Sequence, residues 1–405
     1  MLEAALSAGF CSVGADVVSL GIAPTPLVSF AARTEDFVLG AIISASHNPA
    51  PDNGIKLVGH DGRKLPDAAE LAIEQLMGAE SSERPTGAKV GSITNSASST
   101  EHYLKFLEAI VPERLEGMKV AVDGAHGAAY ALGPEIVRRL GAEVVVTGDN
   151  PDGLNINAEG GATKPDTIQK LTVQSGCDVG VAFDGDADRA VFSDDKGRLI
   201  NGDRTIGIWA VHQKKRGALD PTIAVGTVMS NGGFEAYLAW QGVTLERTPV
   251  GDKYVAAKIT NMNARIGGEQ SGHIIFPERG PTGDGLVTML ELLRVLKVEN
   301  RPASSFYDDY EPWPQLLVNI EVADRNTWKD GSFVQATLAR AEADLHGHGR
   351  LNVRASGTQP MLRVMVEADK YELRDRVAES IVSALETEAG GKVYSRVDLT
   401  HALGD

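Results

Sequence analysis

Three times along this chain, a short apolar run ends directly in a polar loop. The three loops are Ser44-Ala45-Ser46-His47-Asn48-Pro49, Asp184-Gly185-Asp186-Ala187-Asp188-Arg189 and Gly268-Glu269-Gln270-Ser271-Gly272-His273. Strand-like and helix-like segments alternate around each of them, which is typical of sheets with mainly parallel strands. In such sheets, ligands bind beyond the carboxyl ends of the strands. The sequence therefore predicts three α/β units whose functional loops lie at strand ends.

This alternation divides the 405 residues into four predicted domains, at 1–112, 113–202, 203–308 and 309–405. The first three are predicted to be similar α/β domains with mixed, mainly parallel sheets around a cleft. The apolar run 37–43 is expected to be a buried strand of a parallel sheet. In the last domain strands flank helices, which predicts a smaller α+β layer. Residues 302–314 contain proline and are interpreted as a linker.

The composition excludes several classes of function. A net charge of −16 argues against a nucleic-acid or anionic-membrane partner, whereas an anionic small molecule needs only a few local cations. Cys11 and Cys177 are far apart and not in metal-binding spacing, so both are expected to be free thiols in a reducing compartment. No apolar run is long enough to cross a bilayer, and the start has no basic signal-peptide region. A cytoplasmic protein is expected.

The aspartate loop has the strongest chemical signal. Asp184, Asp186 and Asp188 alternate along the chain, and an all-oxygen ligand set is typical of Mg²⁺. A calcium loop of the EF-hand type is disfavoured, because Arg189 stands where that loop needs glycine. A solvated acidic turn is the remaining alternative, although three neighbouring carboxylates repel one another unless a cation joins them.

The other loops are weaker signals when each is taken alone. Ser46 is either a nucleophile or a turn residue, and Lys56 follows it across a hairpin turn. Glu269 and Ser271 could bind sugar hydroxyls, whereas a lone histidine such as His273 is more often structural.

A fourth loop, residues 354–360, is a candidate phosphate site. Gly357 permits close backbone approach, Ser356 and Thr358 carry hydroxyls, and Arg354 can bind phosphate through two hydrogen bonds, with Arg363 following. A turn with an exposed arginine is the alternative. Together, the four loops fit phosphoryl transfer to or from a phosphosugar, where catalysis is mostly positioning and charge neutralisation.

In this order, the four loops resemble the α-D-phosphohexomutase superfamily. That family combines a serine loop with D-G-D-A-D-R, G-E-x-S-G-H and R-x-S-G-T-x-P loops. Gln270 and the segment Pro151-Asp152-Gly153-Leu154-Asn155-Ile156-Asn157 resemble its bacterial phosphoglucosamine mutase branch. The resemblance implies interconversion of glucosamine 6-phosphate and glucosamine 1-phosphate, for UDP-N-acetylglucosamine and cell-wall synthesis. Phosphomannomutase or phosphoglucomutase activity is the alternative within the family; a phosphatase or a non-catalytic phosphosugar-binding protein are alternatives outside it.

The resemblance also implies roles for individual residues. Ser46 would carry the phosphate, which would bind Mg²⁺ together with the three aspartates. Lys56 and Arg189 would flank the transferred group, and Lys56 or His273 would move the hydroxyl proton. The sugar hydroxyls would bind Glu269 and Ser271, and the reaction would pass through a bisphosphorylated sugar. The non-reacting phosphate would bind the fourth loop, through Arg354, Ser356, Gly357, Thr358 and Arg363.

The chain departs from the family pattern at its start. Two family segments, F-G-T-D-G-x-R-G and G-R-D-T-R, are absent, and a predicted helix at 2–8 begins without a capping residue. One first sheet with strands near 16–20, 37–43 and 55–58 is expected to lack its N-terminal strands, which in-frame sequence upstream of Met1 would encode. The first domain is then expected to be loose, aggregation-prone or dimer-dependent, with Ser46 held imprecisely and little or no mutase activity. A homodimer is left open.

Overall fold

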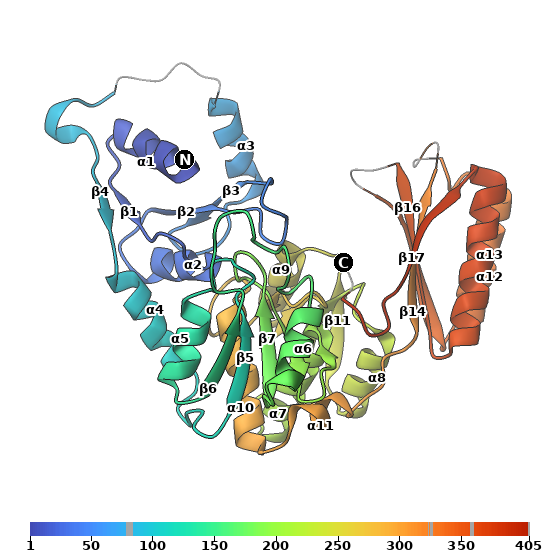
Figure 1. Cartoon of the computed structure of the whole chain (residues 1–405). Helices are drawn as coiled ribbons and strands as arrows, with labels where there is room; N and C mark the ends of the chain where they lie inside the picture. The colour runs from blue at the N-terminus through green and yellow to red at the C-terminus, as the bar shows by residue number, and fades with distance from the viewer. Residues whose placement is uncertain (78–83, 323, 325–326, 357–359, 404–405) are drawn as a thin grey trace.

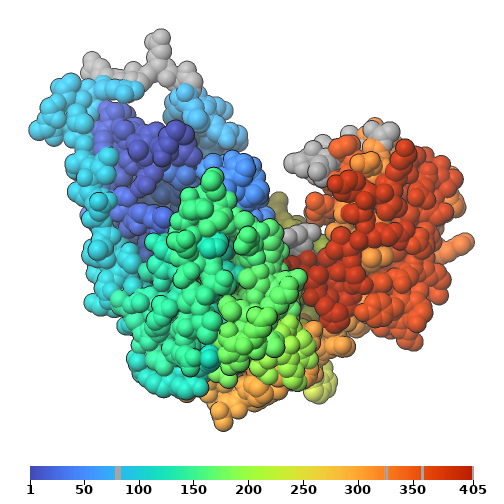
Figure 2. Space-filling model, in the orientation of Figure 1, coloured from blue at the N-terminus to red at the C-terminus, as the bar shows by residue number. Residues whose placement is uncertain are grey.

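The computed structural model describes residues 1–77, 84–322, 324, 327–356 and 360–403. Figure 1 shows three α/β domains that pack together and a C-terminal domain to one side. Figure 2 shows an open notch between the first two domains and the C-terminal domain. No helix in the described part of the chain is long and apolar enough to cross a membrane.

The first domain contains two separate two-stranded sheets among its described residues. Its elements are α1 (Leu2–Ser12), β1 (Val17–Ser19), α2 (Thr25–Thr34), β2 (Leu39–Ile43), β3 (Ile55–Gly59), α3 (Asp67–Leu76), a 3₁₀ turn (Gly87–Lys89), β4 (Ile93–Asn95) and α4 (Ser98–Glu108).

Two expectations for this domain are wrong. β2 is not a buried strand of a parallel sheet: it pairs antiparallel with β3, and only alternate residues of β2 are buried. The three predicted strands do not share one sheet either, because β1 pairs parallel with β4 instead. Residues 44–54 reverse the direction of the chain between β2 and β3, so β3 pairs antiparallel with β2 and their facing backbone groups bond to each other.

The second domain has a mixed sheet in the order β6-β5-β7-β8-β9, in which β5 pairs parallel with β6 and β7 and the later pairs are antiparallel. Both β7 and β8 are fully buried. The turn between them is therefore anchored on both sides. The elements are β5 (Lys119–Asp123), α5 (Leu132–Arg139), β6 (Glu143–Thr147), α6 (Asp166–Gln174), β7 (Val179–Phe183), β8 (Ala190–Asp194) and β9 (Leu199–Ile200).

The third domain repeats this plan with the order β11-β10-β12-β13, and β12 ends at the glutamate loop. Asp284 caps its long helix α10 by accepting a hydrogen bond from the Val287 amide. The elements are α7 (Gly202–Lys215), β10 (Ile223–Thr227), α8 (Gly232–Trp240), β11 (Thr244–Thr248), α9 (Asp252–Met262), β12 (Gly267–Gly268), β13 (Ile274–Ile275) and α10 (Gly285–Glu299).

The first three domains share one continuous apolar core. It extends from Leu27 on α2 through Phe183 on β7 to Leu286 on α10. The core also includes the short helix α11 (Ala303–Tyr307), where Tyr307 packs under the guanidinium of Arg204 at 3.6 Å from the ring centre. The interpretation of residues 302–314 as a linker is therefore wrong for their first half.

The C-terminal domain has its own core and an antiparallel sheet in the order β15-β16-β14-β17, packed against α12 and α13 (Figure 1). The strand β17 was not predicted, because it is an edge strand that buries little apolar surface. The elements are β14 (Gln315–Glu321), α12 (Ser332–Leu345), β15 (Gly349–Ala355), β16 (Met361–Ala368), α13 (Tyr371–Ala389) and β17 (Lys392–Asp398).

Candidate active site

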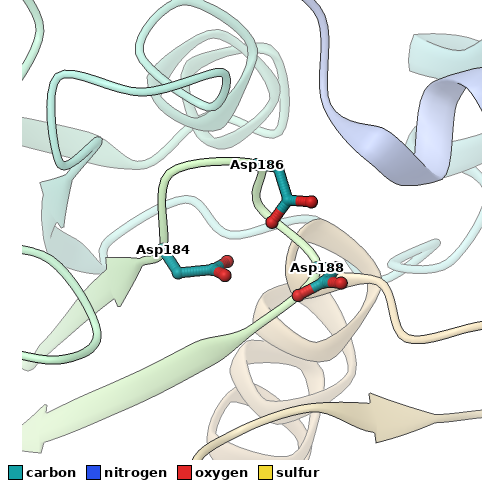
Figure 3. A group of neighbouring side chains, drawn as sticks. All are labelled: Asp184, Asp186 and Asp188. Atoms are coloured by element: carbon teal, nitrogen blue, oxygen red, sulfur yellow. The ribbon is translucent and has the colours of Figure 1, made fainter. Parts of the chain in front are cut away.

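The turn between β7 and β8 gathers three carboxylates. Ligand oxygens of Asp184, Asp186 and Asp188 lie within 4.8 Å of one another, and all three residues are buried. Figure 3 shows the three side chains converging from one loop. Burial, together with the charges of Asp188 and Asp186, raises the pKa of Asp184 well above its usual value. One oxygen each of Asp186 and Asp188 has no hydrogen-bond partner among the described residues. This dense, incompletely satisfied set of hard oxygens fits a divalent metal ion.

The serine loop meets this cluster. Ser46 Oγ donates a hydrogen bond of 2.9 Å to Asp184 Oδ2, and the Ser46 amide donates one of 2.8 Å to Ser44 Oγ. The Ser46 backbone has φ +56°, a left-handed conformation that is uncommon for residues other than glycine and recurs at functional sites. The fold therefore points the Ser46 hydroxyl at the aspartate cluster. The second domain thus also contributes a contact to this loop through Asp184.

Two groups of the first domain bind Asp186. Lys56 Nζ on β3 donates to Asp186 Oδ2 at 2.8 Å, as its spacing from Ser46 predicted. Thr25 Oγ1, at the start of α2, donates to the same oxygen at 2.9 Å. Burial lowers the pKa of Lys56, but the carboxylates of Asp186, Asp188 and Asp184 outweigh that effect, so the net shift is upward. Thr25 was not predicted from the sequence, since nothing local separates it from an ordinary helix-start residue.

Arg189 and His273 join the aspartate and glutamate loops. They form an isolated antiparallel bridge, and the Arg189 amide donates to Asp184 Oδ1 at 3.1 Å. His273 Nδ1 lies 3.5 Å from Asp188 Oδ1, while its Nε2 accepts a hydrogen bond of 3.2 Å from the Gly283 amide. A carboxylate oxygen thus lies near one ring nitrogen and a backbone amide bonds to the other, and these two contacts orient the ring beside the aspartate loop.

The glutamate loop lies directly against the aspartate loop. The Ala190 amide donates to the Gly272 carbonyl at 3.1 Å, where β8 begins. Glu269 Oε1 accepts a hydrogen bond of 2.9 Å from the Gly251 amide, and Ser271 is buried beside it. The structure therefore places the loop that carries Glu269 and Ser271 against the aspartate loop, and the binding of sugar hydroxyls by these two residues stays a prediction.

The fourth loop begins at the end of β15 in the C-terminal domain. Arg354 on β15 stands directly opposite Arg363 on β16. Like charges in this position repel, and the buried Nε of Arg363 has no hydrogen-bond partner among the described residues. Burial and then Arg363 lower the pKa of Arg354. An anion bound between the two guanidiniums would relieve this repulsion and accept hydrogen bonds from both. Ser356 follows them, and its amide donates to the Met361 carbonyl; the predicted Gly357 and Thr358 lie outside the described residues.

Besides that of Thr25, a second contact at the site was not predicted from the sequence. Asn157, on the loop between β6 and α6, donates from Nδ2 to the carbonyls of Ser46 and Asn48, each at 3.0 Å. It is the last residue of the segment 151–157, which drew attention through a resemblance but suggested no role of its own.

Comparison with known proteins now decides the family. Models of phosphoglucomutase/phosphomannomutase alpha/beta/alpha domains I, II and III match residues 1–84, 101–197 and 201–313, and the C-terminal domain model matches 317–384. The chain is 46% identical over 390 residues to the phosphoglucosamine mutase of Symbiobacterium thermophilum, covering 96% of this chain and 87% of that protein.

The chain belongs to the phosphoglucomutase/phosphomannomutase family.

Within this family, the chain lies in the phosphoglucosamine mutase branch, which confirms the resemblance. The phosphoglucosamine mutase of Desulforudis audaxviator is 44% identical, with 94% of this chain and 85% of that protein covered. Solved structures share the fold: a phosphoglucomutase/phosphomannomutase family protein from Burkholderia thailandensis has a TM-score of 0.79 at 24% identity, covering 97% and 87% of the two chains. The Aspergillus fumigatus N-acetylphosphoglucosamine mutase, solved with GlcNAc-6P and magnesium, has a TM-score of 0.63 at 21% identity, covering 94% and 93%.

Proposed function

We propose that this chain interconverts glucosamine 6-phosphate and glucosamine 1-phosphate, with Ser46 carrying the transferred phosphate. One observation supports this most strongly: the Ser46 hydroxyl, in a left-handed backbone conformation, lies 2.9 Å from a carboxylate of the buried aspartate cluster. The branch to which the chain belongs supports the choice of sugar.

In this proposal, the metal ion is Mg²⁺, bound by Asp184, Asp186 and Asp188 together with the phosphate on Ser46. When bound, it neutralises charge on the phosphoryl group during transfer. The residues around the cluster then have separate tasks. Lys56 adds a positive charge from the first domain, and Arg189, whose amide bonds to Asp184, adds one from the end of the aspartate loop.

The first transfer moves the phosphoryl group from Ser46 to a sugar hydroxyl. The bond between phosphorus and Ser46 Oγ breaks, a bond to the sugar oxygen forms, and the hydroxyl proton leaves to a base. Lys56 and His273 are the two candidates for exchanging this proton, and either must be in its neutral form to accept it. Lys56 Nζ bonds to Asp186 Oδ2, and His273 Nδ1 lies 3.5 Å from Asp188 Oδ1.

The remaining loops orient the substrate in this proposal. Glu269 and Ser271 bind sugar hydroxyls, while Arg354 and Arg363 bind the phosphate that does not react. The bisphosphorylated sugar then reverses its orientation in the site and returns its other phosphate to Ser46. This requires the C-terminal domain to reach across the notch in Figure 2, so that both ends of one phosphosugar are bound. A cytoplasmic location fits the two free cysteines, Cys11 and Cys177.

A coupled assay of the purified chain tests this function, with glucosamine phosphates and mannose phosphates compared in parallel. We expect isomerisation of the glucosamine phosphates to be the faster reaction, and Ser46→Ala to abolish it. Faster turnover of mannose phosphates would favour a phosphomannomutase. Release of free phosphate without isomerisation would favour a phosphatase, and binding without turnover a non-catalytic protein.

A further inference from the structure

Asn157 connects the serine loop to a different domain. It lies on the second domain, yet its side-chain amide donates hydrogen bonds of 3.0 Å to two carbonyls of the first domain, those of Ser46 and Asn48. Its own backbone amide donates to the Ala125 carbonyl at 3.0 Å, so the loop that carries it is anchored after β5. The residue is buried.

The orientation of the Asn157 amide is determined by its neighbours. If the side chain were reversed, Oδ1 would face two carbonyl oxygens and no hydrogen bond would form. In the observed orientation, Oδ1 itself has no hydrogen-bond partner among the described residues. An unsatisfied buried oxygen is unfavourable, and we interpret its presence as the cost of directing both amide hydrogens at the serine loop.

Gly185 of the aspartate loop packs directly against the hydrogen bond between Asn157 and the Ser46 carbonyl. A Cβ atom on Gly185 would lie 2.5 Å from the Ser46 carbonyl oxygen and 2.7 Å from Asn157 Nδ2. The absence of a side chain at Gly185 therefore lets three segments meet: the serine loop, the aspartate loop and the loop of Asn157. Movement of the Ser46 carbonyl would disturb all three.

Ser46 needs such support because its backbone has φ +56°. Its hydroxyl bond to Asp184 cannot provide it throughout the reaction, because the same oxygen becomes bonded to phosphorus. The hydrogen bond from Asn157 reaches the carbonyl instead and is independent of the state of the hydroxyl. We propose that Asn157 is a positioning residue that keeps Ser46 aimed at the aspartate cluster in both the free and the phosphorylated enzyme. This inference rests on the proposed role of Ser46 as phosphate carrier.

Two substitutions separate this role from general stability. Asn157→Gly removes the amide and keeps the left-handed backbone, since the φ of Asn157 is also +56° and glycine adopts that region freely. Asn157→Asp keeps the shape but turns the donor into an acceptor facing two carbonyls. The matched control is Asn155→Asp, two residues earlier in the same loop. Asn155 bonds to Asn150 and Asp152 and makes no described contact with Ser46.

The first measurement is the steady-state kinetics of isomerisation. For both Asn157 variants we expect kcat to fall by about tenfold to a hundredfold, as for a reacting group displaced by about 1 Å. KM for the phosphosugar should change by less than about threefold, because its binding groups lie on other loops; a KM effect alone would overturn the proposal. Equal kcat in wild type and Asn157→Gly, or an equal loss in Asn155→Asp, would overturn it too.

The second measurement does not depend on catalysis. Amide hydrogen exchange across residues 44–50 should be faster in Asn157→Gly than in wild type, and unchanged in Asn155→Asp. If the wild type shows no mutase turnover, the proposed function fails, whereas faster exchange in Asn157→Gly still supports the role of Asn157 in holding the serine loop. Unchanged exchange in Asn157→Gly would refute this positioning role, whatever the activity of the variant.

Discussion

An ion pair of the C-terminal domain, with a fully buried carboxylate and a partly buried arginine, contacts the third domain, and its removal should destabilise the protein strongly. The carboxylate of Glu367 is fully buried and accepts hydrogen bonds from Arg350 Nε at 2.9 Å, the Gly232 amide at 2.8 Å and Gln315 Nε2 at 3.1 Å. Burial raises the pKa of Glu367, and the nearby charge of Arg350 opposes that shift.

The arginine also contacts the neighbouring domain directly. Its guanidinium donates to the backbone carbonyls of Val228 and Ser230, which follow β10. Arg350→Met would remove these bonds and leave the Glu367 carboxylate buried without its cation. Removal of one partner of a buried pair costs about 3–5 kcal/mol of the free energy of unfolding. In the double variant with Glu367→Leu, no charge is stranded, and we expect a coupling of about 2 kcal/mol or more between the two changes.

Urea unfolding of the single and double variants measures these differences. Arg396→Met is the matched control, because Arg396 pairs with Glu379 on the surface of the same domain, where such pairs contribute below about 1 kcal/mol. If Arg350→Met shifts the unfolding midpoint no more than Arg396→Met does, the buried pair does not hold the domains as described. Arg350 and Arg354 lie on one strand, about 13 Å apart, so we also expect the weakened contact to raise KM for the phosphosugar.

Three further outcomes follow from the structure. Arg354→Lys keeps the charge but loses the two-pronged contact, so phosphosugar affinity measured by calorimetry should fall by about tenfold to a hundredfold, while an unphosphorylated sugar should be unaffected; equal affinity would make the loop structural. Asp186→Asn should weaken Mg²⁺ binding, measured by titration, by more than the roughly tenfold loss seen for outer ligand partners, and unchanged activity after complete chelation would exclude the metal role. Burial raises the pKa of Asp284 to about 6. This carboxyl therefore stabilises the folded state fully below its unfolded pKa near 4, and that contribution is lost as the pH rises through 6. The free energy of unfolding of Asp284→Asn minus that of wild type should grow by about 1–3 kcal/mol from pH 4 to pH 7, and a constant difference would contradict this shift.

Much of the active site could be predicted because its signals are local. An apolar run that ends in a polar cluster indicates a strand end, and the structure places Ser46, Asp184 and Glu269 at such ends. The alternation of the three aspartates required no knowledge of the fold. The spacing of Lys56 from Ser46 across a short turn likewise predicted its contact with the cluster.

The rest depends on contacts between distant residues. The antiparallel pairing of β2 shows that an apolar run alone does not specify its partner strand. Asn157 reaches Ser46 across 111 residues, and an asparagine in a polar loop gives no sign of such a contact. The burial of Glu367 could not be predicted either, because its cation and its amide donor lie on different elements.

The phosphate on Ser46 is the central claim, and intact-mass analysis with peptide mapping tests it most directly. Wild-type chain and Ser46→Ala would each be incubated with glucose 1,6-bisphosphate and Mg²⁺, then analysed for mass and for mutase turnover. We predict one added phosphoryl group located on Ser46 in the wild type, and neither phosphate nor turnover in the alanine variant. Phosphate found only on another residue, or full turnover by Ser46→Ala, would contradict the assignment of Ser46 as the phosphate carrier.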